Sequence, residues 1–350
     1  MTIDKAYSCM EYWRSRYLGE KPTLEWQGNS RAGFSSWKKK FRKVFIDCLG
    51  RFPEPGCPLE PETLETIETV DYVRKKIVYN ADAYSKIPAY LFIPKGIQFP
   101  APAVVCPHGH GRGKKDPAGI GDKDWEKRHL EGYNYNYAEQ FARRGYIAIA
   151  PDLRCFGERT DDKETIYGFM EIEEGEHWCD INFIRGMLLG YNLLTLHIFD
   201  IGRAIDYLTS TKLVDSGRIG CAGLSQGGTT TLFSTAYDKR IRVAGVSGYL
   251  NSWRSFPLIT GQICGSQIVP GLLHYGDHAE VAGLICPRPL FVEFGSMDPI
   301  FPVEATRQTY AMVQTIYAAA GHEDRLDSEE FEGKHQFKGN KIFDFFDDWL

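Results

Sequence analysis

The sequence has no long apolar run, no basic tract and no segment typical of a signal peptide. The absence of an apolar stretch of about 18 residues excludes an ordinary membrane-spanning helix. Because the net charge is −5 and no basic run is long, nucleic acid is not an expected partner. The first five residues, Met-Thr-Ile-Asp-Lys, begin no apolar segment, so we expect a cytoplasmic chain without membrane contact.

The nine cysteines are odd in number and scattered, and no Cys-x-x-Cys pair occurs among them. This arrangement favours neither a disulfide framework nor a zinc site, and reduced thiols fit it best. Internal repeats and low-complexity segments are also missing.

The 350 residues are enough for one large α/β domain or two small ones. Hydrophobic residues make up 43% of the chain and charged residues 25%, as in an ordinary globular protein. Short apolar or alternating runs predict strands at residues 67–79, 87–93, 101–106, 146–150, 218–223, 241–246, 290–294 and 329–332. Helical periodicity predicts helices at residues 137–144, 193–208, 303–320 and 343–350. Such alternation predicts a mostly parallel sheet with helices on both faces.

The N-terminal residues 1–62 read as a helical extension that precedes a catalytic domain at residues 63–350. Apolar residues recur at helical spacing from Trp37 to Leu49, after a candidate N-cap at Ser35 and Ser36. We expect this extension to offer a contact for a homo-oligomer. Two long irregular stretches, near residues 155–186 and 249–282, follow predicted strands and are interpreted as lid insertions.

The strongest chemical motif is Gly-Leu-Ser-Gln-Gly at residues 223–227, between an apolar run and a helical segment. This Gly-x-Ser-x-Gly pattern predicts a sharp turn that exposes the Ser225 hydroxyl as a nucleophile. Glycines at 223 and 227 are expected because a Cβ would collide where strand and helix pass closely. The backbone N–H of Gln226 then faces the position where an oxyanion would form. The alternative is a glycine-rich turn with an idle serine.

An acid and a histidine follow in the chain order that such a serine requires. Asp298 comes just after the strand predicted at 290–294, where it would orient a histidine, although an Asx turn before Pro299 is an alternative. His335 lies after the last predicted strand and would act as general base and acid. Its rival is His322, which looks like a residue at a helix C-terminus.

A second oxyanion donor is expected in the loop after the strand at 101–106, which carries His-Gly-His-Gly at residues 108–111. Glycines let this backbone turn an amide inwards, and we predict the amide of His110. The pair His108 and His110 could instead bind a metal, but two-residue spacing with no nearby carboxylate disfavours it.

Together these residues resemble the α/β-hydrolase superfamily, and within it the dienelactone hydrolase-like and acetyl xylan esterase-like branch. The resemblance covers roughly residues 65–350 and rests on the 108–111 run, the 223–228 elbow, Asp298 and His335. The Ser-Gln-Gly-Gly form of the elbow is similar to that of acetyl xylan and cephalosporin C deacetylases. Those enzymes have Arg-Gly-Gln where this chain has Arg154-Cys155-Phe156. Dienelactone hydrolases proper have a cysteine at the place of Ser225.

The resemblance implies an α/β-hydrolase fold and a serine carboxylic ester hydrolase that forms an acyl-serine and needs no cofactor or metal. We expect short-chain, acetyl-type esters, with acetylated carbohydrates among them, because aromatic residues crowd both irregular stretches. Substrate contacts are predicted from His108, Gly109, Arg154, Trp178 and Trp253, although Arg154 also suits an ion pair and the aromatics could form a core of their own. A prolyl-oligopeptidase-type peptidase and a non-catalytic binding protein are the alternatives.

Overall fold

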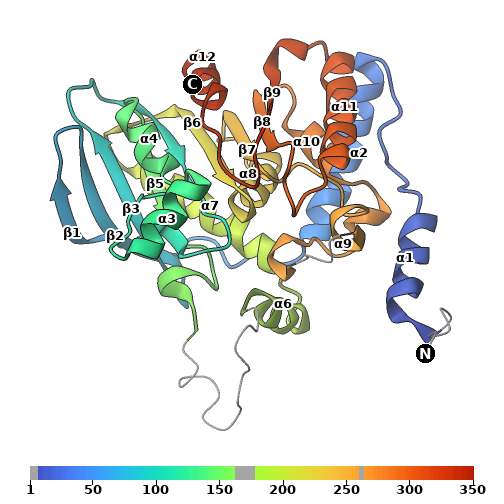
Figure 1. Ribbon diagram of the computed structural model, residues 1–350, viewed down its shortest axis with the longest axis horizontal. Helices are drawn as coiled ribbons and strands as arrows, with labels where there is room; N and C mark the ends of the chain where they lie inside the picture. Colours follow the sequence, from blue (N-terminus) through green and yellow to red (C-terminus); the bar gives the residue numbers. More distant parts are fainter. Residues whose placement is uncertain (1–6, 162–177, 260–263) are drawn as a thin grey trace, which may run out of the picture.

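A nine-stranded sheet runs through the part of the chain described by the computed structural model, which covers residues 7–161, 178–259 and 264–350 (Figure 1). The strand order is β1-β2-β3-β5-β4-β6-β7-β8-β9. The strands are β1 (Glu62–Glu68), β2 (Tyr72–Asp82), β3 (Ser85–Pro94), β4 (Ala101–Val105), β5 (Ile147–Pro151), β6 (Val214–Leu224), β7 (Val243–Ser247), β8 (Leu290–Gly295) and β9 (Leu326–Phe331).

The sheet is antiparallel at one end and parallel through the rest. β1, β2, β3 and β5 pair antiparallel, whereas β5 through β9 pair parallel in spatial order. The register aligns Leu224 with Ser247 at the carboxyl ends of β6 and β7. In sheets of this kind ligands bind outside the carboxyl ends of the strands. The predicted fold class, mostly parallel and covered by helices on both faces, is confirmed.

Helices cover both faces of the sheet (Figure 1). α7, α8, α10 and α11 pack on one face, whereas α4 and α12 pack on the other. The helices are α1 (Cys9–Gly19), α2 (Arg31–Leu49), α3 (Asp124–Tyr133), α4 (Tyr137–Arg143), α6 (Trp178–Leu188), α7 (Leu193–Ser210), α8 (Gln226–Tyr237), α9 (Phe256–Ile259), α10 (His278–Ile285), α11 (Val303–Ala320) and α12 (Lys341–Trp349). Within the described ranges, no helix combines the length and apolarity needed to cross a membrane.

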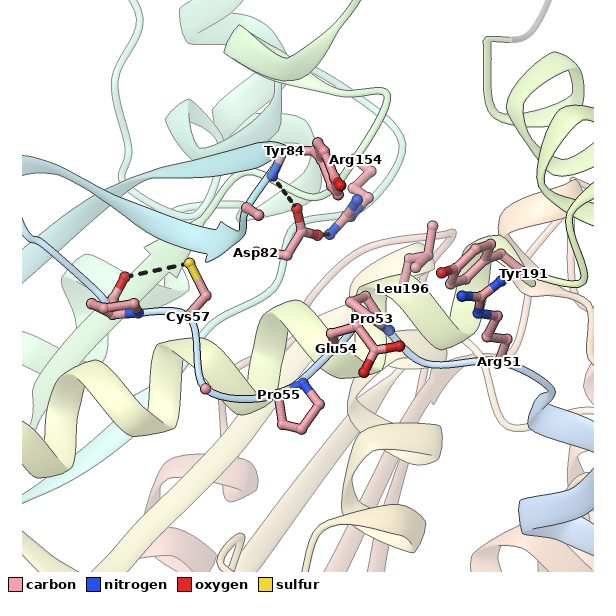
Figure 2. A pocket seen from close by; sticks show the side chains of 13 residues that line it. Arg51, Pro53, Glu54, Pro55, Cys57, Asp82, Tyr84, Arg154, Tyr191 and Leu196 are labelled. Carbon is pink, nitrogen blue, oxygen red and sulfur yellow. Dashed lines mark hydrogen bonds and ion pairs between the residues drawn. The ribbon is translucent and has the colours of Figure 1, made fainter.

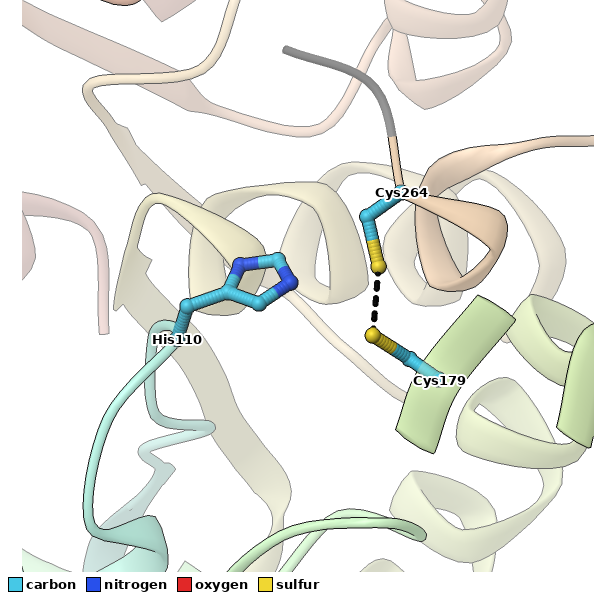
Figure 3. A group of neighbouring side chains, drawn as sticks. All are labelled: His110, Cys179 and Cys264. Carbon is cyan, nitrogen blue, oxygen red and sulfur yellow. Dashed lines mark hydrogen bonds between the residues drawn. The ribbon is translucent and has the colours of Figure 1, made fainter. Parts of the chain in front are cut away.

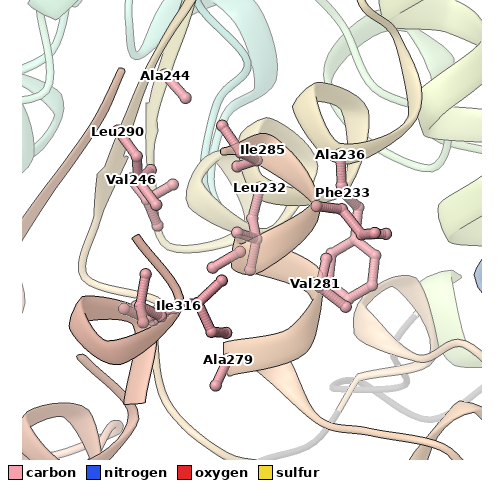
Figure 4. Close-up of a cluster of buried hydrophobic side chains, with 14 of the residues drawn as sticks. Leu232, Phe233, Ala236, Ala244, Val246, Ala279, Val281, Ile285, Leu290 and Ile316 are labelled. Carbon is pink, nitrogen blue, oxygen red and sulfur yellow. The ribbon is translucent and has the colours of Figure 1, made fainter. Parts of the chain in front are cut away.

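The core beside the carboxyl half of the sheet joins strands β7 and β8 to helices α8, α10 and α11 (Figure 4). Val246 and Leu290 from the strands face Leu232, Ile285 and Ile316 from the helices, and all five are fully buried. Burial of such side chains stabilises the fold by about 1.5–3 kcal/mol each. This packing fixes the strand ends from which the candidate site is built.

Helix α2 packs into the same core instead of standing apart. Its N-cap is Ser30, whose hydroxyl accepts a hydrogen bond from the Gly33 amide, so the cap predicted at Ser35 and Ser36 was wrong. The apolar face from Trp37 to Leu49 is buried against the chain itself and is not free for a partner. Most exposed large apolar side chains described in the extension lie on α1, which carries Met10, Tyr12, Trp13 and Leu18. Tyr7 precedes this helix, and Ile46 lies on α2.

Several elements differ from the sequence prediction. β1 is a fully exposed, acidic edge strand without an apolar pattern. Helix α3 was not predicted, and it buries no residue, so it lacks a core-facing stripe. Helices α6, α9 and α10 lie wholly or mostly in the stretches predicted to be irregular. Every residue of α10 is buried, which removes the one-sided periodicity that marks a surface helix.

Candidate active site

Ser225 occupies a strained turn between β6 and α8. Its φ and ψ angles are 61° and −119°, outside the regions that an L-residue readily adopts. The Ser225 amide donates a hydrogen bond to the carbonyl of Ser247 on the neighbouring strand, at 3.0 Å. This hydrogen bond to the adjacent strand stabilises the strained conformation of Ser225, which the Gly-x-Ser-x-Gly pattern predicts.

The two glycines of the motif are required by close backbone approaches. A Cβ on Gly223 would lie 2.6 Å from the carbonyl oxygen of Pro107 and 2.7 Å from the carbonyl carbon of Gly227. A Cβ on Gly227 would overlap the same Pro107 oxygen. The elbow is thus packed against the loop after β4 as well as against itself, which the sequence did not indicate.

Asp298 and His335 are brought together by loops after β8 and β9. The Nδ1 atom of His335 lies 2.7 Å from Oδ2 of Asp298. The other carboxylate oxygen, Oδ1, accepts hydrogen bonds from the amides of Ile300 and Phe301 at 2.8 and 3.1 Å. Asp298 therefore forms the Asx turn and also contacts the His335 ring.

The His335 ring is enclosed but keeps one nitrogen unbonded. Only 7% of the residue is exposed, and its Nε2 has no hydrogen-bond partner among the described residues. Phe301 and Tyr133 flank the ring, with centroids at 5.6 and 6.3 Å. A Cβ on Gly248, the residue after Ser247, would lie 3.1 Å from Cε1 of the ring. The ring thus borders the strand end that also binds the Ser225 amide.

Glu293 supports the histidine loop and was missed by the sequence analysis. This fully buried carboxylate accepts hydrogen bonds from the amides of Lys338 and Gly339, at 2.9 and 3.2 Å. Its backbone carbonyl accepts from the Gly248 amide at 2.9 Å. Burial raises the pKa of Glu293 to about 7. A charged residue inside the apolar run at 290–294 was the signal that could have revealed it.

The loop after β4 runs past the serine. A Cβ on Gly109 would lie 3.3 Å from the Ser225 Cβ, so the bare backbone borders the nucleophile, and His110 follows it. His108 is different, because its ring is completely buried. Its Nε2 accepts from the Leu153 amide at 3.0 Å, and its Nδ1 lies 2.7 Å from the Gly109 carbonyl.

The predicted substrate contact from His108 is therefore a structural contact. With both nitrogens used by backbone groups, the ring has no polar atom left for a substrate. Burial lowers the pKa of His108, which keeps the imidazole neutral.

A buried ion pair also stabilises this loop. The sequence analysis did not predict it. The ammonium of Lys114 lies 2.6 Å from Oδ2 of Asp152, and neither side chain is exposed to more than 1%. Asp152 also accepts from the amides of Lys114 and Glu158. Asp116 binds Arg112 within the same loop. Breaking such a buried pair leaves an uncompensated charge, so the loop is firmly held.

Comparisons with known proteins agree with this architecture. A family profile described as Abhydrolase family matches residues 17–241. The chain belongs to the Abhydrolase family.

One relative of this Abhydrolase protein is YtaP of Bacillus subtilis (strain 168), whose name describes it as a hydrolase. It is 28% identical over 292 residues, which cover 81% of this chain and 89% of YtaP. Among solved structures, a Bacteroides fragilis NCTC 9343 protein assigned as an acetyl xylan esterase superposes with a TM-score of 0.74. The two sequences are 18% identical, and the superposition covers 93% of this chain and 82% of the Bacteroides fragilis chain. A glucuronoyl esterase from Solibacter usitatus has a TM-score of 0.66 at 17% identity, with 93% and 96% covered.

The Gln226 side chain of this Abhydrolase protein is structural. Its Oε1 accepts from the Ser266 hydroxyl at 3.0 Å, and its Nε2 donates to the Ser266 carbonyl at 3.1 Å. The same nitrogen lies 3.4 Å from Nδ1 of His197, whose pKa burial lowers to about 3. Only the backbone amide of Gln226 is left for the predicted oxyanion role, and it lies in the first turn of α8, where amides have no partner within the helix.

Arg154 lies in a separate cleft of about 730 Å³ (Figure 2). The guanidinium binds Asp200 at 3.0 Å and Asp82 at 2.9 Å. Neither Ser225 nor His335 lines this cleft. Arg154 is thus the ion-pair residue of the alternative interpretation, and the structure does not bring it to the serine.

The predicted aromatic contacts divide in the same way. Trp253 is 5% exposed, donates its indole N–H to the Gln267 carbonyl at 3.2 Å and packs on the ring of His278 at 4.6 Å. Tyr249 and Phe256 are buried beside it. The substrate contact predicted for Trp253 was therefore wrong, because these rings form an internal core.

The first aromatic group is only partly described. Trp178 begins α6 and is half-buried, so it keeps its predicted substrate role as a prediction. Asp180 binds the Gly265 amide at 2.6 Å and serves the local structure. Phe183, also in α6, packs against Gly265. The other members of this group lie outside the described residues: Tyr167, Phe169, Glu171, Glu173, Glu174 and Glu176.

Proposed function

We propose that this protein is a serine carboxylic ester hydrolase that acts through an acyl-serine intermediate. The observation that carries the proposal is the His335 ring, which is bound to Asp298 through Nδ1 and has an unbonded, buried Nε2. A neutral imidazole held in this tautomer can accept a proton only at Nε2. The strained Ser225 is the hydroxyl that the family's chemistry requires nearby.

In the first half of the reaction, the Ser225 oxygen attacks the ester carbonyl while His335 Nε2 takes the hydroxyl proton. The Asp298 carboxylate stabilises the imidazolium that results. The carbonyl oxygen becomes an oxyanion, which the amides of Gln226 and His110 would bind. Collapse of this intermediate breaks the ester bond, and the imidazolium gives its proton to the departing alcohol.

In the second half, water replaces the alcohol. His335 takes a proton from the water, and the resulting hydroxide attacks the acyl carbonyl of the acyl-serine. The second oxyanion collapses to release the carboxylic acid, and the proton returns to the Ser225 oxygen. No cofactor or metal takes part in this proposed cycle.

Short-chain esters, with acetylated carbohydrates among them, are the substrates we propose. Solved structures with this fold include proteins named acetyl xylan esterase, among them one from Paenibacillus sp. R4 that covers 96% of this chain. Two curated relatives, YtaP and YitV of Bacillus subtilis (strain 168), carry hydrolase and esterase names. Trp178, at the start of α6, is the aromatic residue for which we still propose stacking on a sugar.

A fluorophosphonate probe tests the proposal, since it labels only an activated serine. We expect one label on Ser225 in the wild type and none in Ser225→Ala, together with hydrolysis of p-nitrophenyl acetate. A folded wild-type protein that takes no label and releases no nitrophenol would instead be a non-catalytic binding protein. Labelling with cleavage of prolyl peptides and no esters would favour the peptidase.

A further inference from the structure

Three side chains that could bind a metal ion converge beside the loop after β4 (Figure 3). They are His110 from that loop, Cys179 from the first turn of α6 and Cys264 just before the short helix Gly265–Gln267. Their ligand atoms, one nitrogen and two sulfurs, all lie within 4.8 Å of one another. In Figure 3 the imidazole points toward both sulfurs.

We propose that His110, Cys179 and Cys264 form a binding site for a soft divalent cation, with Zn²⁺ as the best match. Zn²⁺ prefers nitrogen and sulfur donors such as one imidazole and two thiolates, whereas Mg²⁺ and Ca²⁺ prefer oxygen donors. Three protein ligands leave one tetrahedral position for water or another small ligand. This inference does not depend on the proposed esterase activity.

The backbone that carries the two cysteines is held independently of the thiols. The Gly265 amide donates to Asp180 at 2.6 Å, which joins the residues next to each cysteine. Gly265 also packs so tightly on Phe183 that a Cβ would overlap that side chain. Both cysteines are buried, with 4% and 7% exposed. The sulfurs are thus placed side by side by contacts that a metal need not supply.

The charge balance also suits this location. When Zn²⁺ binds, the two thiols release their protons to solvent and the neutral imidazole contributes a lone pair. Two thiolates and one Zn²⁺ then give a site of zero net charge, which limits the penalty of burying ions. The Ser266 hydroxyl, 3.0 Å from the Cys264 sulfur, donates its proton to Oε1 of Gln226 and adds no charge to the site.

Only small side-chain movements are needed to receive the ion. With Zn–S bonds of about 2.3 Å, tetrahedral geometry separates two sulfurs by about 3.8 Å. The sulfurs of Cys179 and Cys264 are 2.8 Å apart, so they must part by about 1 Å. Shared between two side chains, this is a rotation of roughly 20° each, within the normal spread of a rotamer.

A titration with Co²⁺, which reports thiolate ligation by its visible and near-ultraviolet absorption, tests the site. The full-length protein is reduced with a phosphine, freed of metal by a chelator and titrated without oxygen. We expect one Co²⁺ per chain with a sulfur-to-metal charge-transfer band, and we expect Zn²⁺ to abolish the band. An octahedral spectrum like that of the free ion would overturn the proposal.

Variants assign the ligands. Cys179→Ser and Cys264→Ser should each weaken Zn²⁺ binding at least about 100-fold and reduce the charge-transfer band, because each removes a ligand. His110→Ala should weaken Zn²⁺ binding but keep the charge-transfer band. Cys9→Ser, at an exposed thiol distant in sequence from all three ligands, should change neither the affinity nor the band. Unchanged Co²⁺ spectra in both cysteine variants would place the metal elsewhere and refute the site.

A measurement on the wild type covers the case in which a variant does not fold. Zn²⁺ should protect Cys179 and Cys264, but not Cys9, from alkylation followed by mass spectrometry. If the metal-free protein forms a Cys179–Cys264 disulfide in air and Zn²⁺ does not slow this reaction, the pair is a redox couple and the metal proposal fails.

Discussion

Asp298 binds the His335 ring with one carboxylate oxygen and holds its own loop in place with the other. The carboxylate is nearly fully buried, at 2% side-chain exposure. Its orientation is fixed by two backbone amides before any substrate arrives. A carboxylate oriented in advance needs no reorganisation when positive charge develops on the neighbouring imidazole, as the proposed mechanism requires.

Ser225→Ala should abolish ester hydrolysis without unfolding the protein. We expect a fall in kcat/KM on the order of 10³-fold or more, because the acyl-serine route is closed. The glycines that shape the turn remain, so the melting temperature should change little. Ser216→Ala, at an exposed serine before the elbow, is the control and should retain full activity. Near-normal turnover by folded Ser225→Ala would show that another group is the nucleophile.

His335→Ala should match Ser225→Ala in severity, since residues that act as one unit lose activity together. His322→Ala is the matched control. The His322 backbone amide, which caps α11 by donating to Tyr317, remains in the variant, so we expect at most about 1 kcal/mol of destabilisation and nearly full turnover. Steady-state kinetics on p-nitrophenyl acetate checks both, and the opposite pattern would exchange the two histidines.

Gly227→Ala should destabilise the protein, because the new methyl group would overlap the carbonyl oxygen of Pro107. A backbone oxygen in a packed loop cannot rotate away, so we expect a loss of at least about 1–3 kcal/mol in urea unfolding. Gly132→Ala, in α3 with open space around it, should instead be neutral or stabilise by up to about 1 kcal/mol. Equal effects of the two substitutions would disprove the close approach.

Glu293 should make stability fall as pH rises toward neutrality. Its folded pKa of about 7 exceeds the ordinary glutamate value of about 4.3, so the folded state holds the proton more tightly. The resulting stabilisation is complete below the unfolded pKa and is lost as pH rises through about 7. The full effect is at most on the order of 4 kcal/mol.

Unfolding of wild type and Glu293→Gln at pH 5, 6, 7 and 8 measures this contribution. The wild type should lose stability relative to the Gln variant over this interval. Glu280, whose pKa burial also raises to about 7, is present in both proteins and cancels in the comparison. Glu62→Gln, on the exposed strand β1, should follow the wild type. Parallel curves for wild type and Glu293→Gln would contradict the assignment.

Hydrolysis should be faster for acetate than for butyrate, and faster for butyrate than for octanoate. Each methylene that enters an apolar pocket is worth about 0.8 kcal/mol, so falling rates would show that the acyl pocket is closed. Acetylated xylo-oligosaccharides should be preferred to alkyl acetates. Rates that increase toward octanoate would refute the short-acyl proposal. Equal rates on acetylated xylo-oligosaccharides and on alkyl acetates would refute the proposed preference for carbohydrate esters.

Much of the fold was predictable because each buried strand has a continuous apolar run. The strand at Leu290–Gly295 and the helix at Val303–Ala320 match their patterns closely. The exposed strand β1 and the fully buried α10 escaped, since neither has one apolar and one polar side. Periodicity identifies half-buried elements and is silent on elements with uniform surroundings.

The candidate site shows the same limit. The turn at Ser225 and the pairing of Asp298 with His335 were predictable because the roles proposed for these residues require this order along the chain. His108 and Trp253 were misjudged because a sequence shows residue type but not which partner a ring will meet. Glu293 and the Cys179–Cys264 contact depend on residues distant in sequence, and such contacts follow only from the folded topology.

The hydrogen bonds around β8 have a consequence for how this protein can diversify. Ser225 is tied to Ser247, the next residue Gly248 is tied to Glu293, and Glu293 is tied to the loop that follows His335. None of these links passes through the stretches 155–186 or 249–282. Insertions and replacements there can change the surroundings of Ser225 and His335 while the hydrogen bonds that place these two residues stay the same. New specificities are therefore open to this scaffold without a new catalytic apparatus.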